Sequence, residues 1–146
     1  RDCQRETLTL LSRASNSAEF RELIPSALEI ARKYIRLVRN GQVPVEKLVL
    51  EKRLSKSPKE YENLSHQAIA AQQLHREGRY VHAGQNIRYI VTANKAAMQS
   101  NRAVACELFE DPIGYDAEAY VKLLVASFVD LFLPLGYDTS RVKDIL

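Results

Sequence analysis

Four basic residues follow a short apolar run near the middle of the chain. The run is Leu48-Val49-Leu50, and the cations that follow it, within the eight positions 52–59, are Lys52, Arg53, Lys56 and Lys59. Such a run is typical of a buried strand, so the cations would lie where that strand ends. Cations in this place can hold the phosphates of a nucleic-acid backbone without reading its sequence. The alternative is a solvated edge strand, because edge strands often carry lysine to prevent aggregation.

Other cations extend this basic group. Three arginines come later in the chain: Arg76 and Arg79, at a predicted helix end, and Arg88, in a predicted strand. The net charge of +3 is unevenly distributed, since residues 1–105 carry +8 and residues 106–146 carry −5. This asymmetry indicates an anionic partner for the first part, unless the charges only keep the surface hydrated.

No complete set of catalytic residues accompanies the cations. The three histidines, His66, His75 and His82, are nine and seven residues apart, so no two share a helix face as metal ligands. Cys3 and Cys106 also lack ligand spacing, and a reducing, cytosolic compartment is the default. No glycine-rich phosphate loop or serine elbow is present. A cluster of acidic residues offers a metal site, but a solvated loop before a helix cap is the simpler interpretation; its members are Glu107, Glu110, Asp111 and Asp116.

Length and composition predict one domain, or two small lobes that share a core. A chain of 146 residues buries roughly 70% of its unfolded surface, so it needs no metal or disulfide to fold. No apolar stretch approaches the ~20 residues that span a bilayer, and no membrane contact is expected. The chain begins at Arg1 rather than methionine, so we expect a piece of a longer or trimmed protein.

Helices are predicted at both ends of the sequence. A first short helix ends near Arg13, and a second begins near Ala18. Pro25 interrupts the second pattern, and Ser26 with Glu29 forms a capping box, so the helix is predicted to restart at Ser26. Asn40-Gly41 ends it. Its apolar face comprises Ala27, Leu28, Ala31, Tyr34, Ile35 and Val38.

The last part of the sequence predicts the main core helix. Asp116 caps a helix over residues 117–133, which Pro134 and Gly136 terminate, and residues 140–146 begin another. The apolar face of the main helix comprises Tyr120, Leu123, Leu124, Phe128, Leu131 and Phe132.

Strands and one further helix are predicted between these ends. Residues 48–54 form a strand, and Ser57-Pro58 begins a short helical turn. A helix follows over residues 65–77, and Gly78 closes it. Residues 80–82 and 87–92 form two strands joined through Ala83-Gly84, with Ile87, Tyr89 and Val91 on one face of the second. Residues 94–101 form a loop. The predicted fold class is α+β, mostly helical, with a small antiparallel β element.

The order of these segments resembles the thumb of family B DNA polymerases, most of all the archaeal branch. The sequence RDC at residues 1–3 is similar to the tail of the family's Arg-Arg-Asp-x-Cys stretch, and GQNIRYIV at residues 84–91 resembles its Gly-x-x-Ile-x-Tyr-Val strand. YDAEAY at residues 115–120 resembles the start of its last long helix. Residues 39–50, 51–61 and 67–74 resemble the segments between.

The resemblance implies a thumb domain over residues 1–146, with a helical lobe at about 1–47 and 115–146 and a small α/β lobe at about 48–114. The implied partners are primer–template DNA and the palm and fingers of the polymerase, and the implied location is the nucleoid of a prokaryotic cytoplasm. Mg²⁺ would be held by palm aspartates outside this chain, which itself would carry no catalytic residue, metal ligand or cofactor. The residues implied to bind DNA are Lys52, Arg53, Ser55, Lys56, Gln67, Arg88 and Arg102.

Two other functions fit the same residues. The chain could be the small subunit of a split polymerase, which docks on a larger catalytic chain. It could instead be a non-catalytic interaction module derived from a polymerase thumb, whose basic face meets an acidic protein.

Overall fold

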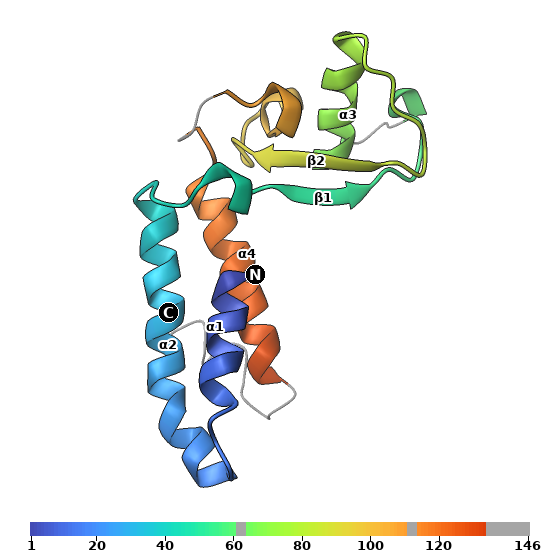
Figure 1. Ribbon diagram of the computed structural model, residues 1–146. Helices are drawn as coiled ribbons and strands as arrows, with labels where there is room; N and C mark the ends of the chain where they lie inside the picture. The colour runs from blue at the N-terminus through green and yellow to red at the C-terminus, as the bar shows by residue number, and fades with distance from the viewer. Residues whose placement is uncertain (61–63, 111–113, 134–146) are drawn as a thin grey trace. The chain divides into compact units, whose positions relative to one another are not determined.

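The computed structural model describes residues 1–60, 64–110 and 114–133. Over these residues the chain forms four α-helices and a small antiparallel sheet of three strands (Figure 1). The α+β, mostly helical fold class predicted from the sequence is therefore confirmed. The chain divides into two compact units: unit 1 contains residues 1–42 and 120–146, and unit 2 contains residues 43–119.

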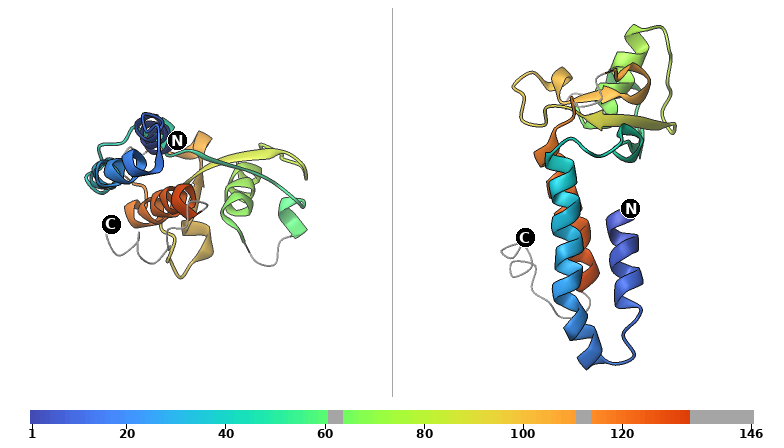
Figure 2. Two further views of the ribbon diagram at one scale, coloured as in Figure 1. Left: turned by 90° about the horizontal axis from the view of Figure 1, so that it is seen from below. Right: turned by 60° about the vertical axis from the view of Figure 1, so that its left-hand side comes forward.

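Three helices lie side by side in unit 1: α1 (Asp2–Leu11), α2 (Ser17–Arg39) and α4 (Ala117–Phe132), of which the part from Tyr120 onward belongs to this unit. Figure 2 shows the three from two further sides. Each helix contributes to one apolar cluster, which consists of Cys3, Leu11, Ala27, Ala31, Phe128, Val129 and Phe132. The Phe128 and Phe132 ring centroids are 4.9 Å apart. This cluster holds unit 1 together, because burying each large apolar side chain contributes about 1.5–3 kcal/mol.

Helix α2 runs unbroken through Pro25, so the predicted restart at Ser26 is wrong. Its N-cap is Asn16, whose Oδ1 accepts a hydrogen bond from the Glu19 backbone N–H at 2.9 Å. A proline inside a helix costs about 3 kcal/mol because it removes one hydrogen bond and crowds the preceding turn. Apolar side chains on both sides of Pro25 pack against the same cluster and offset that cost; they are Phe20, Leu23, Ile24, Ala27, Leu28 and Ala31.

Helix α4 begins as predicted, because the Asp116 Oδ1 accepts a hydrogen bond from the Ala119 backbone N–H at 3.1 Å. Its buried face differs from the predicted one. Leu123 is 46% exposed, whereas Val121 and Val129 are buried beside the predicted aromatic residues. The predicted stop at Pro134 and Gly136 and the final helix over 140–146 lie outside the described residues.

Unit 2 is a sheet with one helix packed against it. The strands β1 (Leu50–Arg53), β2 (Asn86–Val91) and β3 (Ala103–Ala105) are all antiparallel, with β2 in the centre. Helix α3 (His66–Arg76) covers one face (Figure 1). The His66 ring stacks on the Tyr89 ring at 5.9 Å, so Ile87, Tyr89 and Val91 face α3, as their alternation predicted.

The strand predictions in unit 2 are only partly confirmed. Residues 80–82 form a loop instead of a strand, because the His82 backbone N–H donates to the Gln85 side chain at 2.6 Å and the Gln85 N–H donates to the His82 carbonyl at 3.1 Å. The predicted strand over 48–54 is shortened to Leu50–Arg53 by a 3₁₀ turn at Val45–Lys47.

Strand β3 was not predicted, and the side chain of Gln73 on α3 completes its edge. The Gln73 Nε2 donates to the Ala103 carbonyl at 2.8 Å, and its Oε1 accepts from the Ala105 N–H at 2.9 Å. The same Nε2 lies 3.4 Å from the Ser100 carbonyl oxygen. A single amide thus takes the place of a neighbouring strand beside two fully buried alanines.

Candidate nucleic-acid interface

Strand β1 is an exposed edge strand, which corrects the expectation of a buried one. Leu50 is partly buried, but Glu51, Lys52 and Arg53 are all exposed. The buried leucines, Leu48 and Leu54, lie outside the strand, one before it and one after it. The alternative that the sequence left open, a solvated edge carrying cations, therefore describes this strand correctly.

The strand register places Lys52 and Arg53 on opposite faces of the sheet. Lys52 is paired with Ile87, and Arg53 is paired with Asn86. Directly opposed residues share a face, and neighbours along a strand alternate. Lys52 is therefore on the α3 side with Ile87, and Arg53 is on the other side. The two cations cannot bind neighbouring phosphates from a single sheet face.

Arg53 and Arg88 share the face of the sheet that is turned away from α3, and we name them the open-face cations. Arg88 is paired with Glu51, so it is the diagonal neighbour of Arg53 across the β1–β2 ladder. Diagonal neighbours are about 7–8 Å apart, within reach of one another's long side chains. Both are exposed, and neither makes a hydrogen bond or ion pair with a described residue. They are available to an anionic partner.

Gly84 leaves room for the end of the Arg53 side chain. A Cβ atom at this glycine would lie 3.4 Å from the Arg53 Nη2 and 3.9 Å from its Nε. The backbone there has φ +91°, a conformation that favours glycine. The Arg53 guanidinium thus lies against the loop that precedes β2.

The structure places the other predicted DNA-binding residues on separate elements. Ser55 and Lys56 are exposed after β1, and each already has an interaction within the protein. Gln67 is partly buried in the first turn of α3. Arg102 is also partly buried, and its Nε donates to the Ala96 carbonyl at 2.9 Å, which holds the loop before β3. A role at DNA stays a prediction for all four.

His66, His75 and Asp116 contact other residues of the fold. The His66 Nε2 lies 2.7 Å from the Asn94 Oδ1, and the His75 ring meets the Tyr80 ring edge-on. Asp116 caps α4 and also accepts the Asn94 N–H at 2.9 Å. Asp111 lies outside the described residues. Within the described part of the chain, no three histidine, cysteine, aspartate or glutamate side chains are grouped to hold a metal ion.

One exposed aromatic residue was missed as a candidate for binding. Tyr80 is 69% exposed in the loop between α3 and β2. The sequence pattern predicts a strand over residues 80–82, which gives no indication that the Tyr80 ring is exposed. Glycines at positions 78 and 84, on either side of it, were the available signal for a loop, and both have positive φ.

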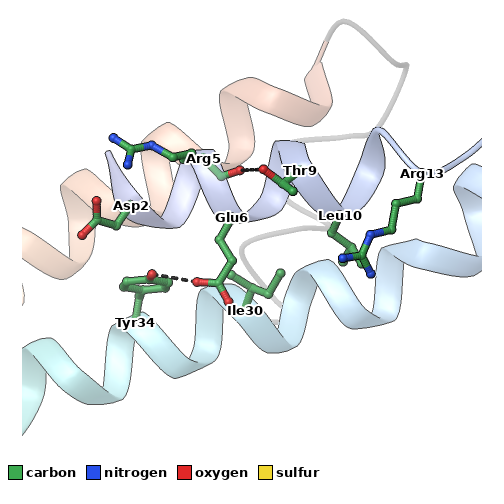
Figure 3. A pocket seen from close by; sticks show the side chains of 8 residues that line it. All are labelled: Asp2, Arg5, Glu6, Thr9, Leu10, Arg13, Ile30 and Tyr34. Atoms are coloured by element: carbon green, nitrogen blue, oxygen red, sulfur yellow. Dashed lines mark hydrogen bonds between the residues drawn. The ribbon is translucent and has the colours of Figure 1, made fainter.

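Unit 1 has an open hollow of about 520 Å³ between α1 and α2. Figure 3 shows that Glu6 points from α1 toward α2 in this hollow. Its carboxylate accepts hydrogen bonds from the Lys33 Nζ at 2.9 Å and the Tyr34 hydroxyl at 2.7 Å. Lys33 and then Tyr34 lower the pKa of Glu6, while burial and then Glu6 raise the pKa of Tyr34 to about 12. The hollow is lined by both signs of charge, from Asp2, Glu6, Arg5 and Arg13.

The lowered pKa of Glu6 predicts a loss of stability in acid. The unfolded carboxyl titrates near 4.5, so its contribution is complete above that pH and disappears as the pH falls through the lower folded value. We expect Glu6→Gln to lower the free energy of unfolding near neutral pH and to match the parent chain in stronger acid. Urea unfolding across this range measures the difference. Glu22→Gln, at an exposed carboxylate of the same helix pair, is the control; equal pH profiles for the two variants would contradict the prediction.

None of the helices in the described residues is both long enough and apolar enough to cross a membrane.

Comparisons with known proteins match nearly the whole chain. The family model described as DNA polymerase family B matches residues 2–135. The chain is 28% identical over 121 residues to DNA polymerase 2 of Aeropyrum pernix, and 31% identical over 123 residues to a DNA polymerase of Pyrococcus horikoshii. Each match covers 82% of this chain but only 15% and 10% of the respective relative. The structure resembles the family B DNA polymerase of the hyperthermophilic archaeon Pyrobaculum calidifontis, with a TM-score of 0.70 and 21% identity over 88% of this chain and 16% of that one.

Proposed function

The chain belongs to DNA polymerase family B, and from this premise we propose that it is the thumb, which grips the primer–template duplex during DNA synthesis. The grip is sequence-independent, because cations that contact phosphates respond to charge and not to bases. The observation that carries the proposal is the pair of open-face cations, which are exposed on an edge strand and have no partner among the described residues.

The proposal assigns the chemistry to other parts of the polymerase. The chain spans 15% and 10% of the polymerase relatives that it matches. Phosphoryl transfer with Mg²⁺ would take place in a palm, in the same or a separate chain, and the palm and fingers would be partners of this unit. In this proposal the chain acts at the DNA of a prokaryotic cell, in the nucleoid. Alone, the chain would bind duplex DNA and synthesise none.

The test is the salt dependence of duplex binding. We expect Arg53→Ala with Arg88→Ala to reduce the magnitude of the slope of log affinity against log salt by about two units, because each neutralised phosphate contributes about −0.9 to that slope. The loss should be alike for all sequences. Fluorescence anisotropy with a primer–template duplex between about 50 and 200 mM salt measures it.

A matched double variant controls for net charge. Arg21→Ala with Lys122→Ala removes two exposed cations from unit 1, and it should leave the slope nearly unchanged. If the Arg53 and Arg88 double variant keeps the parent slope, the DNA-binding assignment is wrong.

Restoring synthesis to a polymerase that lacks its thumb distinguishes the remaining alternatives. A split-polymerase subunit should bind the catalytic chain and restore synthesis when it is added as a separate chain. An interaction module should do neither, and it should also fail to bind duplex DNA at low salt.

A further inference from the structure

We propose that the loop over residues 78–85 stacks an unpaired base of a nucleic-acid strand on the ring of Tyr80. The proposal rests on the proposed function and names an additional ligand, because the duplex contacts above involve phosphates alone. It starts from the exposure of this ring. At 69%, Tyr80 has the highest exposed fraction of the exposed large apolar residues in the described chain.

The Tyr80 ring meets the ring of His75. The Tyr80 and His75 ring centroids are 4.6 Å apart with an interplanar angle of 82°. In this edge-to-face geometry the histidine can cover at most one face of the tyrosine ring. At least one face is therefore not covered by His75. His75 is partly buried in the last turn of α3, so it provides a firm support.

The backbone of the loop is also fixed. The Arg79 N–H donates to the Leu74 carbonyl at 2.8 Å, which ties the start of the loop to α3. The Gly84 N–H donates to the Leu54 carbonyl at 2.7 Å, which ties its end to the segment after β1. A ring on a fixed backbone loses little conformational entropy when it binds, so its stacking energy contributes to affinity.

The charges around the ring favour a nucleic acid over a protein. Arg76 and Arg79 are exposed and form no ion pair with a described residue, and the Arg53 guanidinium lies against Gly84 at the far end of the loop. Glu77 is the single carboxylate in residues 76–85. Aromatic rings beside cations are the arrangement that binds single strands, where each base offers a free π-face. Bases inside a duplex are already stacked, so the ligand is an unpaired strand, such as a template overhang.

The test compares two probes and three variants. We expect Tyr80→Ala to weaken binding of a short single-stranded oligothymidylate by about five- to hundredfold and to leave binding of a blunt duplex unchanged. Tyr80→Phe, which keeps the ring, should bind like the parent chain. Met98→Ala removes another exposed side chain, 64% exposed, from the same unit and should also have no effect.

A spectroscopic measurement tests stacking directly. The fluorescence of 2-aminopurine in a single strand should be quenched when the strand binds to the parent chain or to Tyr80→Phe. The quenching should be much weaker when the strand binds to Tyr80→Ala. The proposal is overturned if Tyr80→Ala binds the single strand as tightly as the parent chain does. It is likewise overturned if the variant's affinity for the blunt duplex falls by the same factor as its affinity for the single strand. It is also overturned if Tyr80→Ala affects only the restoration of synthesis, because the ring would then contact protein.

The outcome is separable from that of the proposed function. Duplex binding that depends on Arg53 and Arg88 but shows no role for Tyr80 would leave the thumb assignment intact. If single-strand binding depends on Tyr80 but duplex binding does not depend on the cations, the proposed duplex grip is contradicted and the proposed stacking site is supported.

Discussion

Replacing both open-face cations, Arg53 and Arg88, with glutamate is expected to weaken duplex binding by about a hundredfold or more at low salt. Each charge-assisted hydrogen bond is worth about 1.5–3 kcal/mol, and about 1.4 kcal/mol corresponds to a factor of ten in affinity. The two glutamates would also repel the phosphates. Fluorescence anisotropy with a duplex probe at several salt concentrations gives both the affinity and the slope.

Lys52→Glu is the matched control, because Lys52 is on the same strand but on the α3 side of the sheet. If DNA lies on the open face, a single reversal at Arg53 should weaken binding more than the reversal at Lys52. The opposite order would place the duplex on the α3 side. Equal effects of the two would mean that DNA follows the strand edge and contacts both faces.

Replacing Gln73 with glutamate is expected to lower the free energy of unfolding of unit 2 by about 2–4 kcal/mol. The change keeps the size of the side chain, but it removes the Nε2 donor and sets an anionic oxygen against the Ala103 carbonyl, now 2.8 Å from that donor. An unsatisfied buried polar group costs about 1–3 kcal/mol, and a charged one costs more. Protonation of the new carboxyl restores a donor, so part of the loss should be recovered in acid.

Gln72→Glu provides the comparison for this experiment. Among the described residues, the neighbouring Gln72 Nε2 makes one hydrogen bond, to the Pro58 carbonyl at 3.1 Å, at a partly buried position. Its replacement should therefore cost about 1 kcal/mol. Urea unfolding of both variants measures the difference, and a Gln73→Glu variant as stable as Gln72→Glu would show that β3 does not depend on the amide.

The sequence predicted those elements whose signals are local. The Asn40-Gly41 helix end is present, with φ +68° at Gly41, and Gly78 closes α3 with φ +77°. The Asp116 cap and the alternation of Ile87, Tyr89 and Val91 also depend on a few neighbouring residues, and all were confirmed.

The errors arose where distant residues decide the local structure. Packing on both sides of Pro25 keeps α2 continuous, although a proline alone predicts a break. Strand β3 has only three residues, and it depends on Gln73, thirty positions earlier, for its outer hydrogen bonds. No local pattern encodes such a partner.

The candidate interface shows the same division. The basic segment after the apolar run was evident from spacing, but its division between two faces follows from the pairing with β2. The same pairing puts Arg88 on one face with Arg53. Arg102, in contrast, donates a hydrogen bond to the Ala96 carbonyl. The strand predicted over residues 80–82 gave no signal that the Tyr80 side chain is exposed.

The cluster of unit 1 is assembled from two stretches of sequence that the whole of unit 2 separates. During ribosomal synthesis, α1 and α2 emerge before α4, so the apolar cluster stays incomplete until Phe128, Val129 and Phe132 have been made. Unit 2 is continuous and can fold before those residues are made. Its folding shortens the intervening segment and so reduces the entropy lost when α4 docks. We therefore expect unit 2 to fold before unit 1. Premature termination near residue 119 would then yield a folded unit 2 attached to α1 and α2, without the part of α4 that completes unit 1.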